Sequence, residues 1–336
     1  IYFYLIFYIV KNSISILFGS QFWGGEMVNY FPKERLKLNR KILGWLDQHY
    51  NKFQINDPVI PAPFFIIGSG RSGTTLLRTI LNGHASIVIP PEIFGFRNGY
   101  MKYKFYQWKD WDHVSKIVIN TYKNGKEFFL WDISLKPIYN KVECLPNENQ
   151  TFARLIDLIF REYLEVNKPI AQFWGDKTPL NTFYLEWIYQ VFPNARYINL
   201  IRDGRDVVSS LKKAGLTNME NACLRWNMAI DHVSNFENKY GTAKVLHVYY
   251  EDLVSNPTKA IKKICKFLSI PFRDQMLDNS GITSNMNDVK YFEHFKNLLN
   301  PINEKSIGKW EKNLSSTEKK MIMNQISINL TKLNYI

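Results

Sequence analysis

Apolar and polar positions along the chain form short buried runs separated by longer amphipathic stretches. The run Phe64–Ile67 predicts a buried strand, and a glycine-rich turn from Gly68 to Gly73 follows it. The next stretch, residues 74–83, has the period of an amphipathic helix. A strand, a glycine-rich loop and a helix in this order are typical of a phosphate-binding site.

The same alternation continues downstream. We predict helices over 151–166, with Thr151 as N-cap, over 180–192, and over 256–270, where Asn256 precedes Pro257. Strands are predicted over 195–201 and from 244, and a turn and helix over 202–213. Because strands alternate with helices, we predict an α/β fold: a single domain whose parallel sheet is flanked by helices, related to nucleotide kinases in layout.

The predicted organisation has four parts. Residues 1–26 read as a leader, because the apolar run 1–10 is too short for a bilayer-spanning helix. It is the remnant of an anchor or signal, translated sequence upstream of a start at Met27, or a buried segment. Residues 27–61 form an N-terminal helical segment with a helix over 33–50. The main domain spans 62–313, with an irregular aromatic-rich insertion or lid at 96–150, and 314–336 form a C-terminal helix.

Composition excludes some classes of protein. Apolar residues make up 46% and charged residues 22%, which excludes a disordered or collagen-like chain. The net charge of +13 favours an anionic partner or reflects only a lysine-rich surface. The three cysteines form no CxxC pair, which argues against a zinc site or a disulfide framework and favours a reducing compartment.

The glycine-rich loop departs from the nucleoside-triphosphate pattern G-x-x-x-x-G-K-[ST]. Gly68 and Gly73 have the required spacing, but Thr74 stands where the lysine belongs and Arg71 supplies a cation inside the loop. The loop is therefore expected to hold a 5′-phosphate group with Arg71 facing the transferred group. The alternative is a turn that binds nothing.

The segment GSGRSGTTLLRTILNGH resembles the 5′-phosphosulfate loop of sulfotransferases, in the branch of tyrosylprotein and bacterial members. The resemblance covers about residues 62–313. It implies 3′-phosphoadenosine 5′-phosphosulfate as donor, adenosine 3′,5′-bisphosphate as product, and no metal. The residues it places around the 5′ end of the donor are Arg71, Ser72, Gly73, Thr74 and Thr75.

A second motif, FPNARYINLIRDGRDVVSSLKK, supports this resemblance. Family members hold the 3′-phosphate of the donor with an arginine and a serine, which correspond to Arg202 and Ser210; a guanidinium suits a phosphate dianion. The alternative is a surface cluster of ion pairs. The tyrosylprotein branch has a further arginine just beyond the serine, and here only Lys213 could replace it.

The resemblance also suggests catalytic groups. Glu92, in IVIPPEIFGF, lies 21 residues after Arg71, at the family's spacing for the catalytic base. Lys177 precedes Arg202 by 25 residues, at the spacing of a lysine that stabilises the transition state, and Asp176 could orient it. The alternatives are an exposed loop glutamate and a surface lysine. His84 is the competing base.

Two further positions match donor contacts of the family. Lys309, before Trp310, lies in a segment similar to the one that closes over the donor, and Tyr250 matches a donor-contacting tyrosine or is a core residue. The family's catalytic serine has no clear counterpart. His294 falls near its position, and we assign it no role.

We therefore predict sulfuryl transfer to a hydroxyl or amine. The rivals are a P-loop kinase of a small molecule and a non-catalytic basic protein that binds nucleic acid or sulfated glycans. The acceptor is a carbohydrate, lipid, small molecule or peptide tyrosine. Secretory members have disulfides near the positions of Pro90 and Lys177, and no cysteine lies there, which favours a cytoplasmic enzyme over a tyrosine-modifying one. It would be membrane-anchored if residues 1–19 are an anchor remnant. We expect no nucleic-acid partner and leave a homodimer open.

Overall fold

The computed structural model describes residues 52–58, 60–278, 286–291, 298 and 300–336, together with Lys41 and Gly44. The predicted leader, most of the predicted helix over 33–50, and His294 lie outside the described residues.

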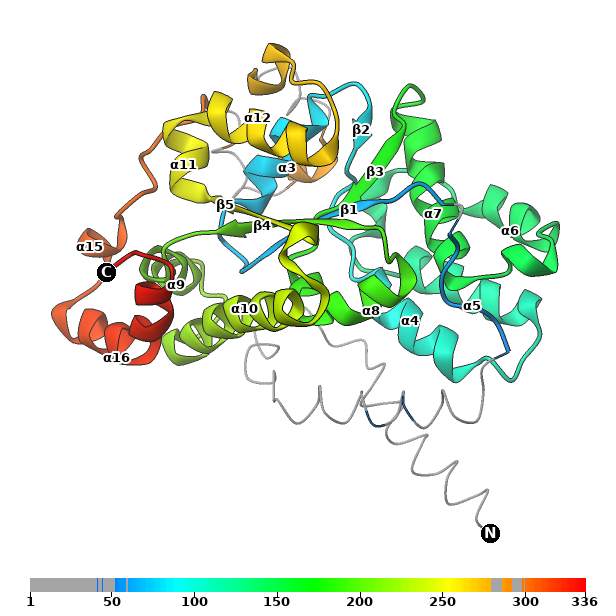
Figure 1. Ribbon diagram of the computed structural model, residues 1–336, viewed down its shortest axis with the longest axis horizontal. Coiled ribbons are helices and arrows are strands. Elements are labelled where there is room, and N and C mark those ends of the chain that lie inside the picture. The colour runs from blue at the N-terminus through cyan, green and yellow to red at the C-terminus, as the bar shows by residue number, and fades with distance from the viewer. Residues whose placement is uncertain are drawn as a thin grey trace, which may run out of the picture.

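Five parallel strands form one sheet in the described part of the chain, in the order β2-β3-β1-β4-β5 (Figure 1). They are β1 (Phe64–Gly68), β2 (Ile87–Val88), β3 (Phe173–Asp176), β4 (Arg196–Ile201) and β5 (Val245–Tyr249). The prediction of an α/β fold with a parallel sheet is confirmed. Because parallel strands end at one edge of a sheet, the segments that follow β1, β3 and β4 share that edge.

Alternate residues of β1 face two different layers. Phe64 and Ile66 pack with α3 (Thr74–Asn82) and α12 (Pro257–Leu268), which lie above the sheet in Figure 1 beside α11 (Tyr250–Ser255). Phe65 and Ile67 face the opposite layer. That layer includes α8 (Leu185–Val191) and α10 (Met219–Tyr240), below the sheet. All five β1 residues are buried, as the uninterrupted apolar run predicts.

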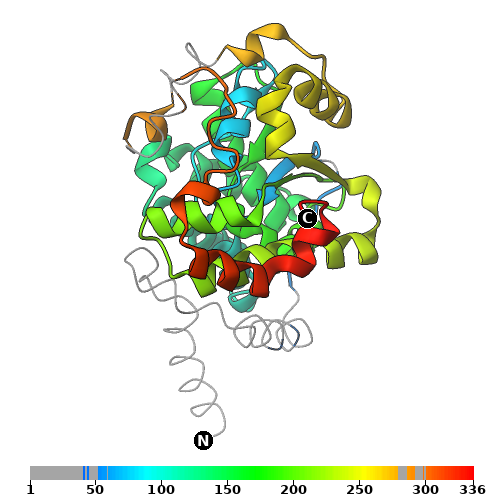
Figure 2. The ribbon, with the colours of Figure 1, turned by 90° about the vertical axis from the view of Figure 1, so that its left-hand side faces the viewer.

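A further apolar cluster joins α9 (Gly204–Lys213) and α10 to the C-terminal helix α16 (Ser316–Lys332). In Figure 2 the red α16 lies across the lower part of the molecule next to the green α10, and the two helices are in contact. Ser315 begins α16 with a capping box, in which its hydroxyl accepts from the Glu318 N–H and the Glu318 carboxylate accepts from the Ser315 N–H.

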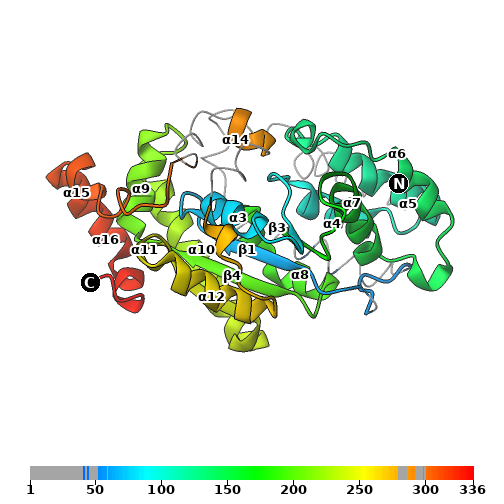
Figure 3. The ribbon, with the colours of Figure 1, turned by 90° about the horizontal axis from the view of Figure 1, so that it is seen from above.

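Residues 96–150 are mostly helical, so the expectation that this stretch is irregular is wrong, while its role as an insertion or lid stays a prediction. It forms α4 (Gly95–Phe105), α5 (Trp111–Lys123), η2 (Phe128–Trp131), α6 (Lys136–Glu143) and η3 (Asn147–Asn149), packed against α7 (Phe152–Asn167). These helices gather at one end of the molecule (Figure 3). The residues of these helices have low helix propensity, and the burial of aromatic rings stabilises the helices instead. The packing of these rings is close: a Cβ on Gly95 would lie 2.4 Å from the Tyr122 ring.

The other predicted elements are close to those observed. Thr151 caps α7 with its hydroxyl, and Asn256 caps α12 with its amide oxygen. The predicted helix over 180–192 is divided into the 3-10 turn η4 (Pro179–Tyr184) and α8. The remaining short elements are η5 (Thr242–Lys244), η6 (Asp274–Leu277), α14 (Asn287–Tyr291) and α15 (Trp310–Asn313).

Candidate functional site

The glycine-rich loop joins β1 to α3 through backbone conformations that favour glycine. Gly68 has φ +132°, and a Cβ there would lie 2.4 Å from the Leu200 carbonyl oxygen. Gly73 has φ +92° and begins α3 without a side-chain cap or an acidic residue in the first turn. The backbone N–H groups at this helix end are suited to an anion.

One side chain fixes the entrance to the loop. The Thr182 hydroxyl accepts from the Gly68 N–H at 2.9 Å and donates to the Gly68 carbonyl at 3.0 Å. No sequence motif indicated Thr182. It could have been suspected only because it follows β3, which lies next to β1 in the sheet and ends at the same edge.

Polar groups inside the loop are buried and only partly paired. Ser72 and Thr74 are buried, and the Ser72 hydroxyl has no hydrogen-bond partner among the described residues. A buried hydroxyl without a partner costs free energy, which a ligand oxygen can offset. The loop residues therefore fit a phosphate group.

Two arginines converge behind the loop. Arg71, in a left-handed conformation with φ +69°, donates from Nε to the Ser210 hydroxyl at 3.2 Å. Arg202 donates from Nη1 to the Arg71 carbonyl at 2.9 Å. Burial, and then the charge of Arg202, lower the pKa of Arg71. The predicted residues Arg71, Arg202 and Ser210 are thus neighbours, and two adjacent guanidinium groups favour an anion between them.

The Arg202 guanidinium lies over the Tyr250 ring, 4.5 Å from its centroid, and its Nε has no hydrogen-bond partner in the described structure. The same ring lies against the loop, since a Cβ on Gly73 would approach it to 2.4 Å. Tyr250 is buried. Tyr250 is therefore a packing residue that supports both the loop and the arginine, and its contact with the donor stays a prediction.

Glu92 and Lys177 form an ion pair beside the loop. Lys177 directly follows β3, is fully buried, and also donates to the Thr75 hydroxyl at 3.2 Å. Burial lowers the pKa of Lys177, and the charge of Glu92 opposes that shift. Lys177 therefore contacts both the predicted base Glu92 and the predicted loop residue Thr75.

Backbone contacts hold the segment that carries Glu92. The Arg78 guanidinium donates to the Pro90 carbonyl at 3.3 Å, the Trp131 indole donates to the Pro91 carbonyl at 3.0 Å, and the Thr178 hydroxyl donates to the Ile93 carbonyl at 3.3 Å. The backbone on both sides of Glu92 is therefore held in place, which fixes the position from which its carboxylate projects.

Asp176 does not bond to Lys177 in the way its position suggests. Its carboxylate accepts from the Thr178 hydroxyl and the Asn181 amide, each at 2.7 Å. Burial raises the pKa of Asp176 to about 6, against the effect of those two hydrogen bonds. Asp176 therefore fixes the turn after β3, and through it the backbone of Lys177.

Lys309 and Lys213 have exposed side chains, Lys309 beside Trp310 and Lys213 in the last turn of α9. Arg202 donates from Nη2 to the Ser306 carbonyl at 2.6 Å, which brings the segment before Lys309 to the arginine site. Among the described residues, the Lys213 side chain makes no hydrogen bond or ion pair that would give it the role of the missing family arginine.

His84 lies at the other end of α3 from the loop. It is buried, and its Nδ1 accepts from the Ser86 N–H at 3.1 Å. Burial lowers the pKa of His84, and a hydrogen bond to the Pro271 backbone opposes this. The structure does not bring this competing base to the site.

The sequence analysis missed a buried ion pair behind Glu92. Arg78 and Asp288 lie 2.6 Å apart with side chains 0% and 4% exposed. Arg78 is on the apolar face of α3, and an arginine at such a position is the one signal that could have indicated it.

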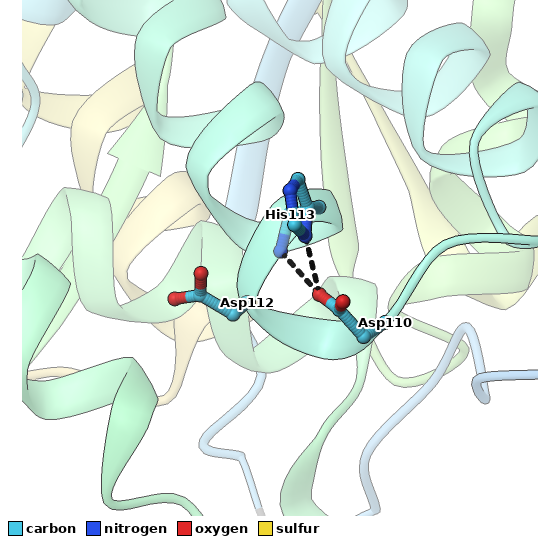
Figure 4. Close-up of side chains that lie close together, drawn as sticks. All are labelled: Asp110, Asp112 and His113. Atoms are coloured by element: carbon cyan, nitrogen blue, oxygen red, sulfur yellow. Dashed lines mark hydrogen bonds and ion pairs between the residues drawn. The ribbon is translucent and has the colours of Figure 1, made fainter.

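Asp110, Asp112 and His113 gather at the start of α5 (Figure 4). Asp110 caps α5 and accepts from the His113 N–H at 2.9 Å, and its Oδ1 lies 2.7 Å from His113 Nδ1. Asp112 pairs with Lys116 at 2.6 Å. The carboxylates are used for a helix cap and an ion pair.

Taken together, the sheet edge and the loop define a P-loop-like α/β protein with an anion site beside an acid–lysine pair. A model of the sulfotransferase family matches residues 63–274, well over half of the chain. The chain belongs to the sulfotransferase family.

Relatives and solved structures agree with this assignment. The chain is 26% identical to protein-tyrosine sulfotransferase A of Caenorhabditis elegans, over 74% of this chain and 61% of that protein. It is 24% identical to protein-tyrosine sulfotransferase 2 of Gallus gallus, over 73% and 62%. The chain thus spans about three fifths of the length of these relatives. The fold is similar to the sulfotransferase domain of the Synechococcus PCC 7002 olefin synthase, with a TM-score of 0.56 and 22% identity over 82% of this chain and 98% of that one.

The expected cytoplasmic location is wrong, because the relatives that the chain matches are protein-tyrosine sulfotransferases. The absence of cysteines near Pro90 and Lys177 was too indirect a signal, since it reports on disulfides and not on a compartment. Within the described ranges, no helix has both the length and the apolar character to cross a bilayer.

Proposed function

We propose that this chain transfers a sulfuryl group from 3′-phosphoadenosine 5′-phosphosulfate to a hydroxyl acceptor. The observation that carries the proposal is the convergence of two guanidinium groups, an uncapped helix N-terminus and an acid–lysine pair at one sheet edge. Membership of the sulfotransferase family supports it.

The donor would bind across the loop. The backbone of 72–75 and the Ser72 hydroxyl would hold the 5′-phosphosulfate, and Arg202 and Ser210 the 3′-phosphate. Support comes from Ser72 Oγ and Arg202 Nε, which are among the buried polar atoms that have no hydrogen-bond partner in the described part of the chain. Both can bind a phosphate oxygen.

Glu92 would act as the general base. It takes the proton from the acceptor hydroxyl as that oxygen bonds to sulfur, and the bond from sulfur to the phosphate oxygen breaks, which releases adenosine 3′,5′-bisphosphate. Lys177, released from part of its ion pair, and Arg71 would stabilise charge on the bridging and transferring oxygens. In the structure Lys177 already contacts both Glu92 and Thr75, so it lies between base and loop.

For the acceptor we propose a peptide tyrosine, because the relatives are protein-tyrosine sulfotransferases. Carbohydrates, lipids and small molecules are the competing acceptors. Transfer of labelled sulfate from the donor to a tyrosine peptide, and no transfer to the matching phenylalanine peptide, would establish this choice. Transfer only to a sugar or lipid hydroxyl would overturn it.

The donor site is tested by calorimetric binding of adenosine 3′,5′-bisphosphate and of ATP with Mg²⁺. We expect the bisphosphate to bind better, and Arg202→Ala to weaken it about 10- to 100-fold, since a charge-assisted hydrogen bond contributes roughly 1.5–3 kcal/mol. Arg196→Ala, at the other end of β4, is the matched control and should leave binding unchanged.

Preference for ATP with Mg²⁺ would favour the kinase. Binding that depends steeply on salt but shows no preference for either nucleotide would favour a non-catalytic basic protein. No binding of either nucleotide by folded protein would overturn the donor site.

A further inference from the structure

The segment 306–310 lies beside Arg202, and the Asp206 carboxylate holds it there together with the bond from Arg202 to the Ser306 carbonyl. Asp206, in the first turn of α9, accepts from the Gly308 N–H with Oδ2 at 2.8 Å and from the Trp310 N–H with Oδ1 at 2.9 Å. The Asp206 side chain is 1% exposed and lies 3.9 Å from the Arg202 guanidinium.

A buried carboxylate is unexpected next to a site that attracts anions, because its charge repels a phosphate. Burial also raises the pKa of Asp206, so its charge is costly to keep. Its two hydrogen bonds to backbone N–H groups offset part of that cost. Here the two amides it holds lie on either side of Lys309.

The backbone conformation of the segment 306–310 is suited to being held in place by Asp206. Gly308 has φ +68°, in the left-handed region, and a Cβ there would meet nothing within 4 Å. Glycine is therefore favoured by the backbone conformation and not by space. Beyond the turn, Trp310 lies under the Arg205 guanidinium at 4.3 Å, and the Asn313 amide donates to the Ser209 hydroxyl at 3.4 Å.

We propose that Asp206 is a positioning residue that holds the segment 306–310 against Arg202 and so fixes the geometry of the proposed site for the 3′-phosphate of the donor. The inference rests on the proposed sulfuryl transfer. Asp206 itself makes no bond to the nucleotide; it acts through the amides of Gly308 and Trp310.

The substitution Asp206→Asn distinguishes a positioning role from a purely electrostatic one, because the two roles predict opposite changes in the affinity for adenosine 3′,5′-bisphosphate. Removing a negative charge beside an anion site should by itself tighten binding of adenosine 3′,5′-bisphosphate. The Gly308 and Trp310 N–H groups bond to different carboxylate oxygens, and in the amide one of these two positions is an NH₂ donor, so one of the two hydrogen bonds is lost. Positioning therefore predicts weaker binding, by about tenfold for one lost hydrogen bond to a charged group.

Selectivity for the 3′-phosphate provides the second measurement. Adenosine 5′-phosphate lacks that group, so Asp206→Asn should change its affinity by less than about twofold. The matched control is Glu251→Gln, which removes a nearby carboxylate charge while its amide oxygen can still accept from the Asp203 N–H. It should not reduce bisphosphate affinity.

A pair of glycine variants covers the case in which Asp206→Asn fails to fold. Gly308→Ala and Gly215→Ala both place a Cβ at a positive φ, +68° and +63°, with no atom within 4 Å. Only Gly308 lies in the segment, so only Gly308→Ala should weaken bisphosphate binding. Thermal unfolding monitors the stability of each variant.

The outcomes are distinct. Equal or tighter bisphosphate binding by folded Asp206→Asn overturns the inference while leaving the proposed function intact. An equal loss for adenosine 5′-phosphate overturns the assignment to the 3′-phosphate. Absence of bisphosphate binding by the folded unsubstituted chain overturns the inference and the proposed donor together.

Discussion

Glu92 and Lys177, 85 positions apart in sequence, form an ion pair in which the lysine is inaccessible to solvent and the carboxylate side chain is 26% exposed. The lysine also reaches the Thr75 hydroxyl of the phosphate loop. The proposed base, the proposed transition-state cation and the loop thus form one hydrogen-bonded unit, and the base is the member of the ion pair that solvent reaches.

The first prediction concerns the base. Glu92→Gln keeps the size of the side chain but cannot take the acceptor proton, so single-turnover sulfuryl transfer should fall about 10²- to 10⁴-fold. Bisphosphate affinity should stay the same or rise, because the substitution removes a negative charge that acts on Arg71. Rapid-quench transfer of labelled sulfate and calorimetry measure the two quantities.

Glu127→Gln is the matched control for this experiment. Glu127 is half-buried and close enough to Glu92 that the charge of Glu92 contributes to raising its pKa, after burial. Transfer rates for Glu127→Gln should stay near those of the unsubstituted chain. A normal rate for Glu92→Gln would remove Glu92 as the base.

The second prediction concerns the coupling of the pair. Lys177→Met leaves the Glu92 carboxylate without its cation, and we expect a loss of about 1–3 kcal/mol in the free energy of unfolding, less than for a fully buried pair. Adding Glu92→Gln should recover part of that loss, since no unpaired charge remains. Urea unfolding of the two single variants and the double variant gives the coupling energy, and strict additivity would show that the ion pair is not a stabilising contact.

Much of the site could be predicted because its residues follow strand ends in recognisable motifs. Arg71 and Arg202 were found in this way, and parallel pairing of β1 with β4 brings them together. Arg78 and Asp288 could not be paired from sequence, because 210 positions separate them and neither lies in a pattern that specifies the other. The helices at 96–150 were missed because buried aromatic rings, and not intrinsic propensity, stabilise them.

The third prediction concerns that buried pair. Asp288→Ala leaves the Arg78 charge buried without a counterion, which should cost about 3–5 kcal/mol in unfolding free energy. The double variant Arg78→Met with Asp288→Leu should be closer in stability to the unsubstituted chain than Asp288→Ala is. Chemical denaturation tests both. A loss below about 1 kcal/mol for Asp288→Ala would mean that the pair does not hold α14 to α3.

The fourth prediction concerns the close approach of the loop to Tyr250. Gly73→Ala would place a Cβ 2.4 Å from the Tyr250 ring at a φ of +92°, so both a clash and backbone strain are expected. Bisphosphate binding should be lost or strongly reduced. In a Tyr250→Ala background the clash is absent and only the strain remains, so Gly73→Ala should cost less stability there. An equal cost in the two backgrounds would show that the ring does not limit the loop.

The last prediction is a dependence of stability on pH that arises from Asp176. Its pKa is raised to about 6 in the folded chain, from an ordinary value of 3.8, because the carboxyl is buried. Between these two values the folded state binds more protons than the unfolded state, so the contribution of Asp176 to stability falls as pH rises from about 4 to about 6. The fall is at most roughly 3 kcal/mol.

The measurement is the difference in unfolding free energy between the unsubstituted chain and Asp176→Asn, whose amide does not titrate, from pH 4 to pH 7. This difference should decline with pH and level off above about pH 7. Thr178→Val removes one of the hydrogen bonds that favour the carboxylate, so it should move the decline to higher pH. A difference that grows with pH would mean that the hydrogen bonds from Thr178 and Asn181 outweigh the cost of burying the charge, and that the carboxylate is charged throughout.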